Sequence, residues 1–215
     1  MGEFVRARSE EQKEQRMNEI KNAADKLFAI KTYHEITLGA IADELSWSRA
    51  NLYKYVTSKE EIFLEIFQDK QVSYFDDLRA AFPAGSRYSN EITATVWAEI
   101  LNNHQDYLHY GNILTTIIET NVSIERLAAF KTHYYNDADK LSELFSGNLG
   151  ITTKDVDRLI YASYYYSVGI CTDCSRSPKI KEALAYAGIK DKAMDFRDNM
   201  KEFLIMCLSY YRPKK

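Results

Sequence analysis

Apolar side chains recur every three or four positions along most of the chain, which is the period of an amphipathic α-helix. The pattern predicts a first helix that ends near residue 30, two short helices between 37 and 56, and a longer one from 59 to about 82. Further helices are expected at about 89–108, 111–121, 123–146, 153–174 and 191–211, with a short extra helix at 179–188. No stretch shows the alternation of a β-strand, so the sequence predicts an all-α fold.

Residues 37–48 begin the most informative segment of the chain. Apolar side chains share one helical face at Leu38, Ile41, Ala42 and Leu45. Thr37 stands before them as an N-cap, because its hydroxyl can accept an unpaired N–H group of the first turn. The residues Ser46-Trp47-Ser48 then interrupt the helix, and Ser48 can cap the next one.

The second short helix combines basic, aromatic and apolar side chains. We expect Leu52, Tyr53 and Val56 to face inward. The side chains expected to project outward are Arg49, Asn51, Lys54 and Tyr55. Two helices joined by so short a turn, with hydrogen-bond donors on the second, suit the major groove of DNA. This segment therefore favours a DNA-binding protein over an ordinary helical hairpin with a solvated basic face.

An upstream helix supplies the third part of a small core. Together with the two short helices it forms an ordered pattern: Ile20, Ala23-Ala24, Leu27-Phe28, Tyr33, Thr37, Ile41-Ala42, Leu52-Tyr53, Tyr55-Val56 and Ser58-Lys59-Glu60. With these residues the sequence resembles the tetracycline-repressor (TetR) family of bacterial regulators. The resemblance covers about residues 14–67. The remaining chain is similar to the family only in its length and helical character.

Four residues depart from the family pattern. Thr32 and Ser46 stand where the family has glycines, so neither position has the easy left-handed backbone that glycine gives. Trp47 replaces a smaller aliphatic residue, and Val56 replaces a phenylalanine. These changes bear on the packing angle between the helices, but none removes a donor from the DNA-facing side.

The resemblance implies a helix-turn-helix DNA-binding domain over residues 1–60 and an effector-binding and dimerisation domain over 61–215. It also implies a homodimer in which the helices near 153–174 and 191–211 pack against their symmetry mates. The residues expected to need covering there are Leu159, Ile160, Ala162, Ser163, Met200, Phe203, Leu204, Met206 and Cys207. The expected function is transcriptional regulation, as a repressor released from a palindromic double-stranded operator by a small-molecule effector.

Eight residues are candidates for DNA contact. We expect Arg49, Asn51 and Lys54 to reach base edges, since the first residues of a recognition helix lie deepest in the groove. Tyr55 and Lys59 are expected on phosphates, Lys59 because it resembles the family's phosphate-binding lysine. Thr37, Ser48 and Tyr53 complete the set. Gly39 lies where some relatives carry a contacting side chain, so that contact is expected to be missing.

Charge supports a local DNA footprint rather than a general nucleic-acid coat. The net charge is −3, yet residues 46–59 contain three basic residues and no acidic one. No apolar run reaches the length of a membrane span, and the N-terminus lacks the apolar core of a signal peptide. The sequence therefore predicts a cytoplasmic protein without a membrane partner.

Aromatic residues, above all tyrosines, accumulate in the second half of the chain. They could line a cavity for an apolar or aromatic effector, or they could fill the helical core and the dimer interface. The candidate wall residues are Trp97, His104, Tyr107, Tyr110, His133, Tyr134 and Tyr165. Because no dense basic cluster occurs among them, a multiply charged anion is disfavoured as the effector.

Cys171 and Cys174 form a C-x-x-C pair without a second pair or a histidine close by in the sequence, so we expect structural cysteines and no metal site. No P-loop, dinucleotide fingerprint or nucleophile elbow occurs, so neither a cofactor nor catalytic residues are expected. Two alternatives stay open. One is a helical ligand-binding protein or enzyme that uses the Tyr/His cavity, and the other is an all-α interaction adaptor.

Overall fold

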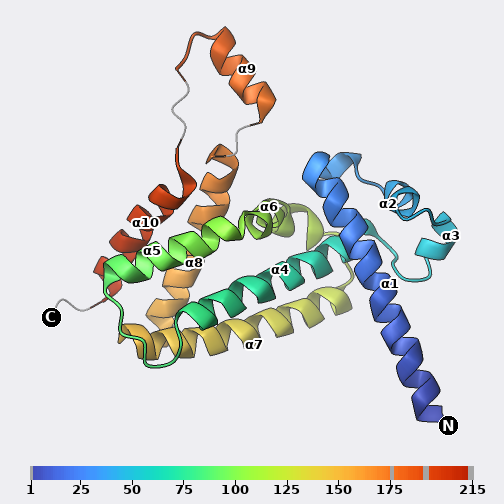
Figure 1. Ribbon diagram of the computed structural model, residues 1–215, viewed down its shortest axis with the longest axis horizontal. Helices are drawn as coiled ribbons and strands as arrows, with labels where there is room; N and C mark the ends of the chain where they lie inside the picture. The colour runs from blue at the N-terminus through green and yellow to red at the C-terminus, as the bar shows by residue number, and fades with distance from the viewer. Residues whose placement is uncertain (1, 175–176, 191–193, 213–215) are drawn as a thin grey trace. The chain divides into compact units, whose positions relative to one another are not determined.

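The computed structural model describes residues 2–174, 177–190 and 194–212, and within these ranges all regular structure is helical. The helices, labelled in Figure 1, are α1 (Gly2–Ile30), α2 (Leu38–Glu44), α3 (Arg49–Leu52), α4 (Lys59–Ala81), α5 (Asn90–Asn103), α6 (Gln105–Ile113), α7 (Ile124–Leu149), α8 (Thr153–Cys174), α9 (Pro178–Tyr186) and α10 (Phe196–Tyr211). A 3-10 turn, η1 (Tyr33–Glu35), and a π-helical turn, η2 (Leu114–Ile118), complete the order. The all-α prediction is confirmed. No helix in the described ranges is both long and apolar enough to cross a membrane.

The chain divides into two compact units. The first contains Met1–Asp69 and Leu114–Phe130, and the second contains Lys70–Ile113 and Lys131–Lys215. The first unit thus extends beyond the domain boundary expected at residue 60. Helix α4 contributes its first half to one unit and its second half to the other.

The core of the first unit follows the helical spacing of its apolar residues. Ile20 of α1, Ile41 of α2 and Leu52 of α3 are fully buried, as are Ile62 and Phe63 at the start of α4. Phe63 anchors the arrangement, because its ring lies edge-on to Phe28 at 5.3 Å and to Tyr33 at 5.0 Å. The expected three-helix core is therefore present, and α4 closes it.

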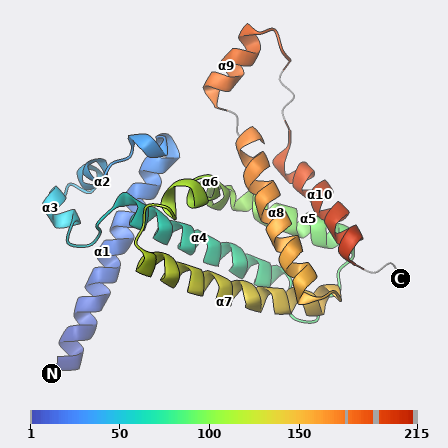
Figure 2. The same cartoon turned by 180° about the vertical axis from the view of Figure 1, so that it is seen from behind.

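In the second unit α10 packs beside α5 and α8, and α6 packs on α8, as the two opposite views show (Figures 1 and 2). Phe75 of α4 contacts Tyr134 of α7 with 6.1 Å between ring centroids. Trp97 of α5 meets Phe145 of α7 at 5.2 Å, and both side chains are buried. Aromatic rings from three helices thus form much of this core.

Two expected boundaries are wrong. A single helix over 89–108 does not form, because α5 ends at Asn103, where His104 leaves helical geometry with φ −110° and ψ 32°. The helix expected to begin at residue 111 begins earlier, because Gly111 lies inside α6, where the position of a Cβ atom would be 2.7 Å from Tyr164 Oη. Because Gly111 has no side chain, Tyr164 of α8 can lie against α6.

Helix α10 begins after Asp195, and residues 191–193 of the expected 191–211 helix lie outside the described ranges.

The surface of α8 and α10 also differs from the expectation. Leu159, Met200 and Leu204 are buried within the chain itself, so the prediction that they need a partner is wrong. Helical spacing alone did not reveal which face each helix turns toward its own core. The large apolar or aromatic residues that these two helices expose are Tyr161, Tyr165, Met206 and Tyr210.

Candidate nucleic-acid interface

The two short helices of the first unit are held by the expected caps. The Thr37 hydroxyl accepts a hydrogen bond from the Ala40 N–H at 3.1 Å, and the Ser48 hydroxyl accepts one from the Asn51 N–H at 3.2 Å. Each cap satisfies an N–H group that a helix start leaves unpaired. The helix-turn-helix therefore has defined ends, and Ser48 sets the direction in which α3 leaves the turn.

The turn between α2 and α3 contains two of the residues that depart from the family pattern, Ser46 and Trp47. Ser46 takes the left-handed conformation, with φ 55°, in which a residue other than glycine is disfavoured by roughly 1–2 kcal/mol. Trp47 lies between α1 and residues 49–59, which we call the recognition segment. The Arg16 guanidinium is 5.4 Å from its ring centroid, and the Tyr55 ring is 5.8 Å away. The larger side chain thus ties α1 to the residues that follow α3.

The recognition segment exposes most of the predicted donors. Arg49 and Lys54 are exposed, and Asn51 is partly buried. Tyr53, expected inside, is 56% exposed, while Tyr55, expected outside, is half-buried beside Trp47. The inward and outward assignments of these two tyrosines were wrong. The reason is that α3 ends at Leu52, after which the helical period no longer applies.

Lys59, expected on a phosphate, is engaged within the protein. Its ammonium donates to the carbonyls of Tyr33 and Ile36 at 2.8 Å each and lies 3.8 Å from the centroid of the Tyr33 ring. The Tyr33 hydroxyl in turn donates to Glu60 at 2.5 Å. Burial lowers the pKa of Lys59, while the neighbouring Glu60 carboxylate acts in the opposite direction. Lys59 therefore fastens the η1 loop to the start of α4.

Replacing Lys59 with alanine is expected to destabilise the fold by about 1–3 kcal/mol, because two carbonyls would lose a charged donor. Lys54→Ala is the matched control, since the Lys54 side chain is exposed and makes no hydrogen bond or ion pair among the described residues. Its stability should change by less than about 0.5 kcal/mol. Urea unfolding of both variants measures the difference, and equal stabilities would remove the fastening role from Lys59.

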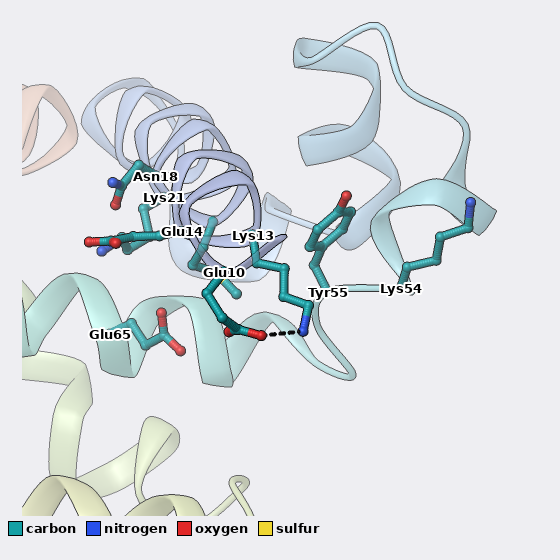
Figure 3. A pocket seen from close by; sticks show the side chains of 9 residues that line it. Glu10, Lys13, Glu14, Asn18, Lys21, Lys54, Tyr55 and Glu65 are labelled. Carbon is teal, nitrogen blue, oxygen red and sulfur yellow. Dashed lines mark hydrogen bonds and ion pairs between the residues drawn. The ribbon is translucent and has the colours of Figure 1, made fainter. Parts of the chain in front are cut away.

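An open groove of about 730 Å³ lies beside the recognition segment (Figure 3). Its wall combines acidic and basic side chains with few apolar ones: Glu10, Lys13, Glu14, Met17, Asn18, Lys21, Lys54, Tyr55 and Glu65. Figure 3 shows Lys54 pointing away from the labelled side chains of α1. Small-molecule pockets are mostly apolar and enclosed, so this groove does not have the character of an effector site.

Comparison with known proteins matches both parts of the chain to models of one family. The model for bacterial regulatory proteins of the tetR family matches residues 20–66, and the model for the tetracyclin repressor-like C-terminal domain matches residues 68–209. Together they cover most of the chain. The chain belongs to the TetR family.

Solved structures share the fold of this TetR-family chain. The fatty acid degradation regulator FadR from Bacillus halodurans has a TM-score of 0.56 at 17% identity, covering 89% of this chain and 94% of that one. A TetR/AcrR-family regulator from Thermobifida fusca gives 0.54 at 17%, covering 93% and 100%, and PfmR from Thermus thermophilus gives 0.52 at 14%, covering 91% and 99%. No curated protein matches. TetR-family proteins are DNA-binding transcription regulators.

The seven candidate effector residues of this TetR-family chain fall into two groups. Trp97, Tyr107, Tyr110 and His104 are buried, whereas His133 and Tyr165 are exposed and Tyr134 is half-buried. The Trp97 indole donates to the Tyr74 hydroxyl at 2.7 Å, and the Tyr107 ring stacks on the Tyr74 ring at 5.4 Å. The structure therefore does not bring all seven to one wall. It gathers Trp97, His104 and Tyr107 around Tyr74, a residue that sequence reasoning missed.

A second residue missed from the sequence is Gln71 of α4. Its side chain is fully buried, and its Oε1 has no hydrogen-bond partner among the described residues. Its Nε2 is 3.4 Å from Asp137 Oδ2, and Asp137 also pairs with Arg79. An unsatisfied buried acceptor is unfavourable by about 1–3 kcal/mol. The sequence offered no signal for it, because a glutamine within an exposed-looking stretch is ordinary.

The C-x-x-C pair lies at the end of α8, where Cys171 is buried and Cys174 is partly buried. No histidine is close to the pair in the sequence, but the fold brings one near, because His109 Nε2 of α6 is 3.9 Å from Cys171 Sγ. Burial, with a smaller contribution from Cys174, raises the pKa of Cys171 to about 11. No group of three His, Cys, Asp or Glu side chains among the described residues could hold a metal ion. The thiol therefore lacks the low pKa of an activated cysteine.

Alkylation of Cys171 at pH 7.5 is expected to be far slower than that of an unperturbed thiol, because its high pKa leaves only a very small thiolate fraction. Mass spectrometry of the iodoacetamide-treated native protein gives the rate for each cysteine, and the same protein in urea provides the unperturbed reference. Modification of native Cys171 as fast as in urea would contradict a buried structural thiol.

Proposed function

We propose that this chain is a homodimeric repressor that binds a palindromic operator and is released by an effector. The observation that carries the proposal is the recognition segment. Arg49 and Lys54 are exposed on a capped helix-turn-helix, and neither side chain has a hydrogen bond or ion pair within the described residues. No acidic residue occurs between Ser46 and Lys59. Donors left unpaired in this way are available to bases and phosphates.

In the proposed complex Arg49, Asn51 and Lys54 reach base edges in the major groove. Arginine can bond guanine O6 and N7 together, and asparagine can bond adenine N6 and N7. Tyr55 and Lys59 approach phosphates. Two of the three N–H groups of the Lys59 ammonium bond carbonyls, so only the third is available to a phosphate. Thr37 and Ser48, which cap α2 and α3, complete the contact set together with Tyr53, which follows α3.

The proposed dimer uses the exposed face of α8 and α10. Tyr165 and Met206 are each 62% exposed, and Tyr161 and Tyr210 are exposed beside them in sequence. The Tyr166 and Phe203 rings stack at 4.0 Å and join the two helices into one surface. Exposed apolar residues on adjacent helices favour a protein partner, and a two-fold dimer would offer two recognition segments to the operator.

For the effector we propose a site in the second unit around Gln71, Tyr74, Tyr107 and Tyr134. The unpaired Gln71 Oε1 would accept a hydrogen bond from the ligand, while the rings would hold its apolar part. Because Trp97 and Tyr107 are closely packed, the effector has to separate side chains that touch in its absence. Gln71 lies on α4, the helix that begins with Lys59, the residue that bonds the carbonyls of Tyr33 and Ile36.

The test is a selection of bound duplexes from random DNA sequence. The proposed function predicts an enriched palindrome whose two halves are about one helical turn apart or a multiple of it. Repeating the binding with metabolite fractions should identify one that lowers affinity. If no sequence is enriched, the chain is not an operator-binding repressor, and a ligand carrier or an adaptor would have to be considered again.

A further inference from the structure

Gly39 of α2 lies directly beneath the side chain of Arg49. A Cβ atom at residue 39 would be 2.7 Å from Arg49 Nη2 and 3.0 Å from Arg49 Cζ and Nε. Three atoms of the guanidinium group therefore lie against the backbone of α2, and Nη2 is closer than a residue with a Cβ atom would allow. Gly39 itself is buried, although it has no side chain to bury.

The fold does not need glycine at this position. Gly39 lies inside α2 and does not have the positive φ of Gly85, Gly150 and Gly188. Glycine is a poorer helix former than alanine, so its presence in a seven-residue helix weakens that helix. The atoms that an added methyl group would meet belong to the end of a flexible side chain. An alanine at 39 would therefore displace Arg49 and leave the backbone in place.

Among the described residues the Arg49 side chain has neither a hydrogen bond nor an ion pair. The surface of α2 at Gly39 therefore helps to set the place of the guanidinium by its shape. Bidentate recognition of guanine requires the planar group to meet O6 and N7 together, and it is sensitive to displacements of less than an ångström. A bare stretch of backbone under the guanidinium limits the positions that it can take.

We infer that Gly39 is a specificity-determining residue that acts by positioning Arg49. Because residue 39 has no side chain, the guanidinium can lie against the backbone of α2. In that position it is directed to one base pair in each half-site. Gly39 thus contributes to sequence recognition without contacting a base through a side chain. The inference rests on the proposed function, because it concerns the same recognition segment.

The experiment measures the affinity of the selected duplex and of duplexes changed one base pair at a time, for wild type, Gly39→Ala, Arg49→Ala and the double variant. Arg49→Ala should lose a preference of roughly fivefold to a hundredfold at one base pair per half-site. Gly39→Ala should lose part of that preference at the same base pair. In the double variant the alanine at 39 should have no additional effect. The melting temperature of Gly39→Ala should equal or exceed that of wild type.

Gly147→Ala is the matched control, because Gly147 also lies inside a helix. Unlike Gly39 it is exposed, and a Cβ atom there would meet nothing within 4 Å. Its base preferences should be those of wild type. The inference is overturned if Gly39→Ala keeps the full preference, or if its effect persists undiminished when Arg49 is absent. A wild-type protein with no base preference at all would instead refute the proposed function, and the inference with it.

Discussion

Replacing both Tyr165 and Met206 with glutamate is expected to produce a monomer whose operator affinity is roughly a hundredfold or more below that of wild type. The two side chains are each 62% exposed on the proposed dimer face, so the folded chain can accept the charges. Across a two-fold interface the same carboxylates would be buried without partners, which is strongly unfavourable. Loss of the dimer removes the second recognition segment, and linked binding of two half-sites commonly raises affinity by about 10²–10⁴.

Sedimentation velocity and fluorescence anisotropy with the full operator and with an isolated half-site measure these effects together. The half-site affinity of the double variant should equal that of wild type, because the recognition segment is untouched. Ile124→Glu is the control, since Ile124 is an exposed apolar residue (81%) outside α8 and α10. A variant that stays dimeric, or that is monomeric yet binds the full operator normally, would contradict the proposed interface.

Truncation of Trp97 to alanine is expected to lower the free energy of unfolding by about 3–5 kcal/mol, as is typical for a large buried aromatic residue. Trp97 is fully buried, its indole N–H bonds the Tyr74 hydroxyl, and its ring meets Phe145. Removing it leaves a cavity and an unpaired hydroxyl. Tyr165→Ala, at an exposed position, should change the free energy of unfolding of the isolated subunit by less than about 0.5 kcal/mol.

Denaturant unfolding of the two variants decides between a packed ring and a ring that lines an open pocket. If Trp97→Ala were nearly as stable as wild type, the ring would not belong to the close-packed core. Gln71→Leu adds a second comparison, because it removes the unpaired buried acceptor. It should keep or raise stability while abolishing the response to effector. A normal effector response in Gln71→Leu would exclude Gln71 from the proposed site.

Features that depend on near neighbours in the chain could be predicted from the sequence. The caps at Thr37 and Ser48 and the buried positions Ile41 and Leu52 follow from residue type and helical spacing over a few residues. The order of matching residues in the first 67 positions was specific enough to indicate the family. Helical spacing failed where α3 ended earlier than expected. Tyr53, predicted to face inward, is exposed, and Tyr55, predicted to face outward, is half-buried.

Contacts between distant parts of the chain could not be predicted. Lys59 bonds carbonyls more than twenty residues earlier, and His109 approaches Cys171 from another helix. Gly39 shows the same limit in a different form. The sequence indicated only a missing DNA contact at that position, whereas the structure places the Arg49 guanidinium in the space that a side chain would occupy.

The central claim, that the segment from Arg49 to Lys59 reads DNA sequence, is tested most directly by one ratio of affinities. Fluorescence anisotropy at a fixed, near-physiological salt concentration gives the dissociation constants of wild type for the selected duplex and for a duplex of the same composition in scrambled order. Sequence-specific regulators commonly show a ratio of about 10³ or more. The account predicts a ratio of that size, and equal affinities for the two duplexes would contradict it.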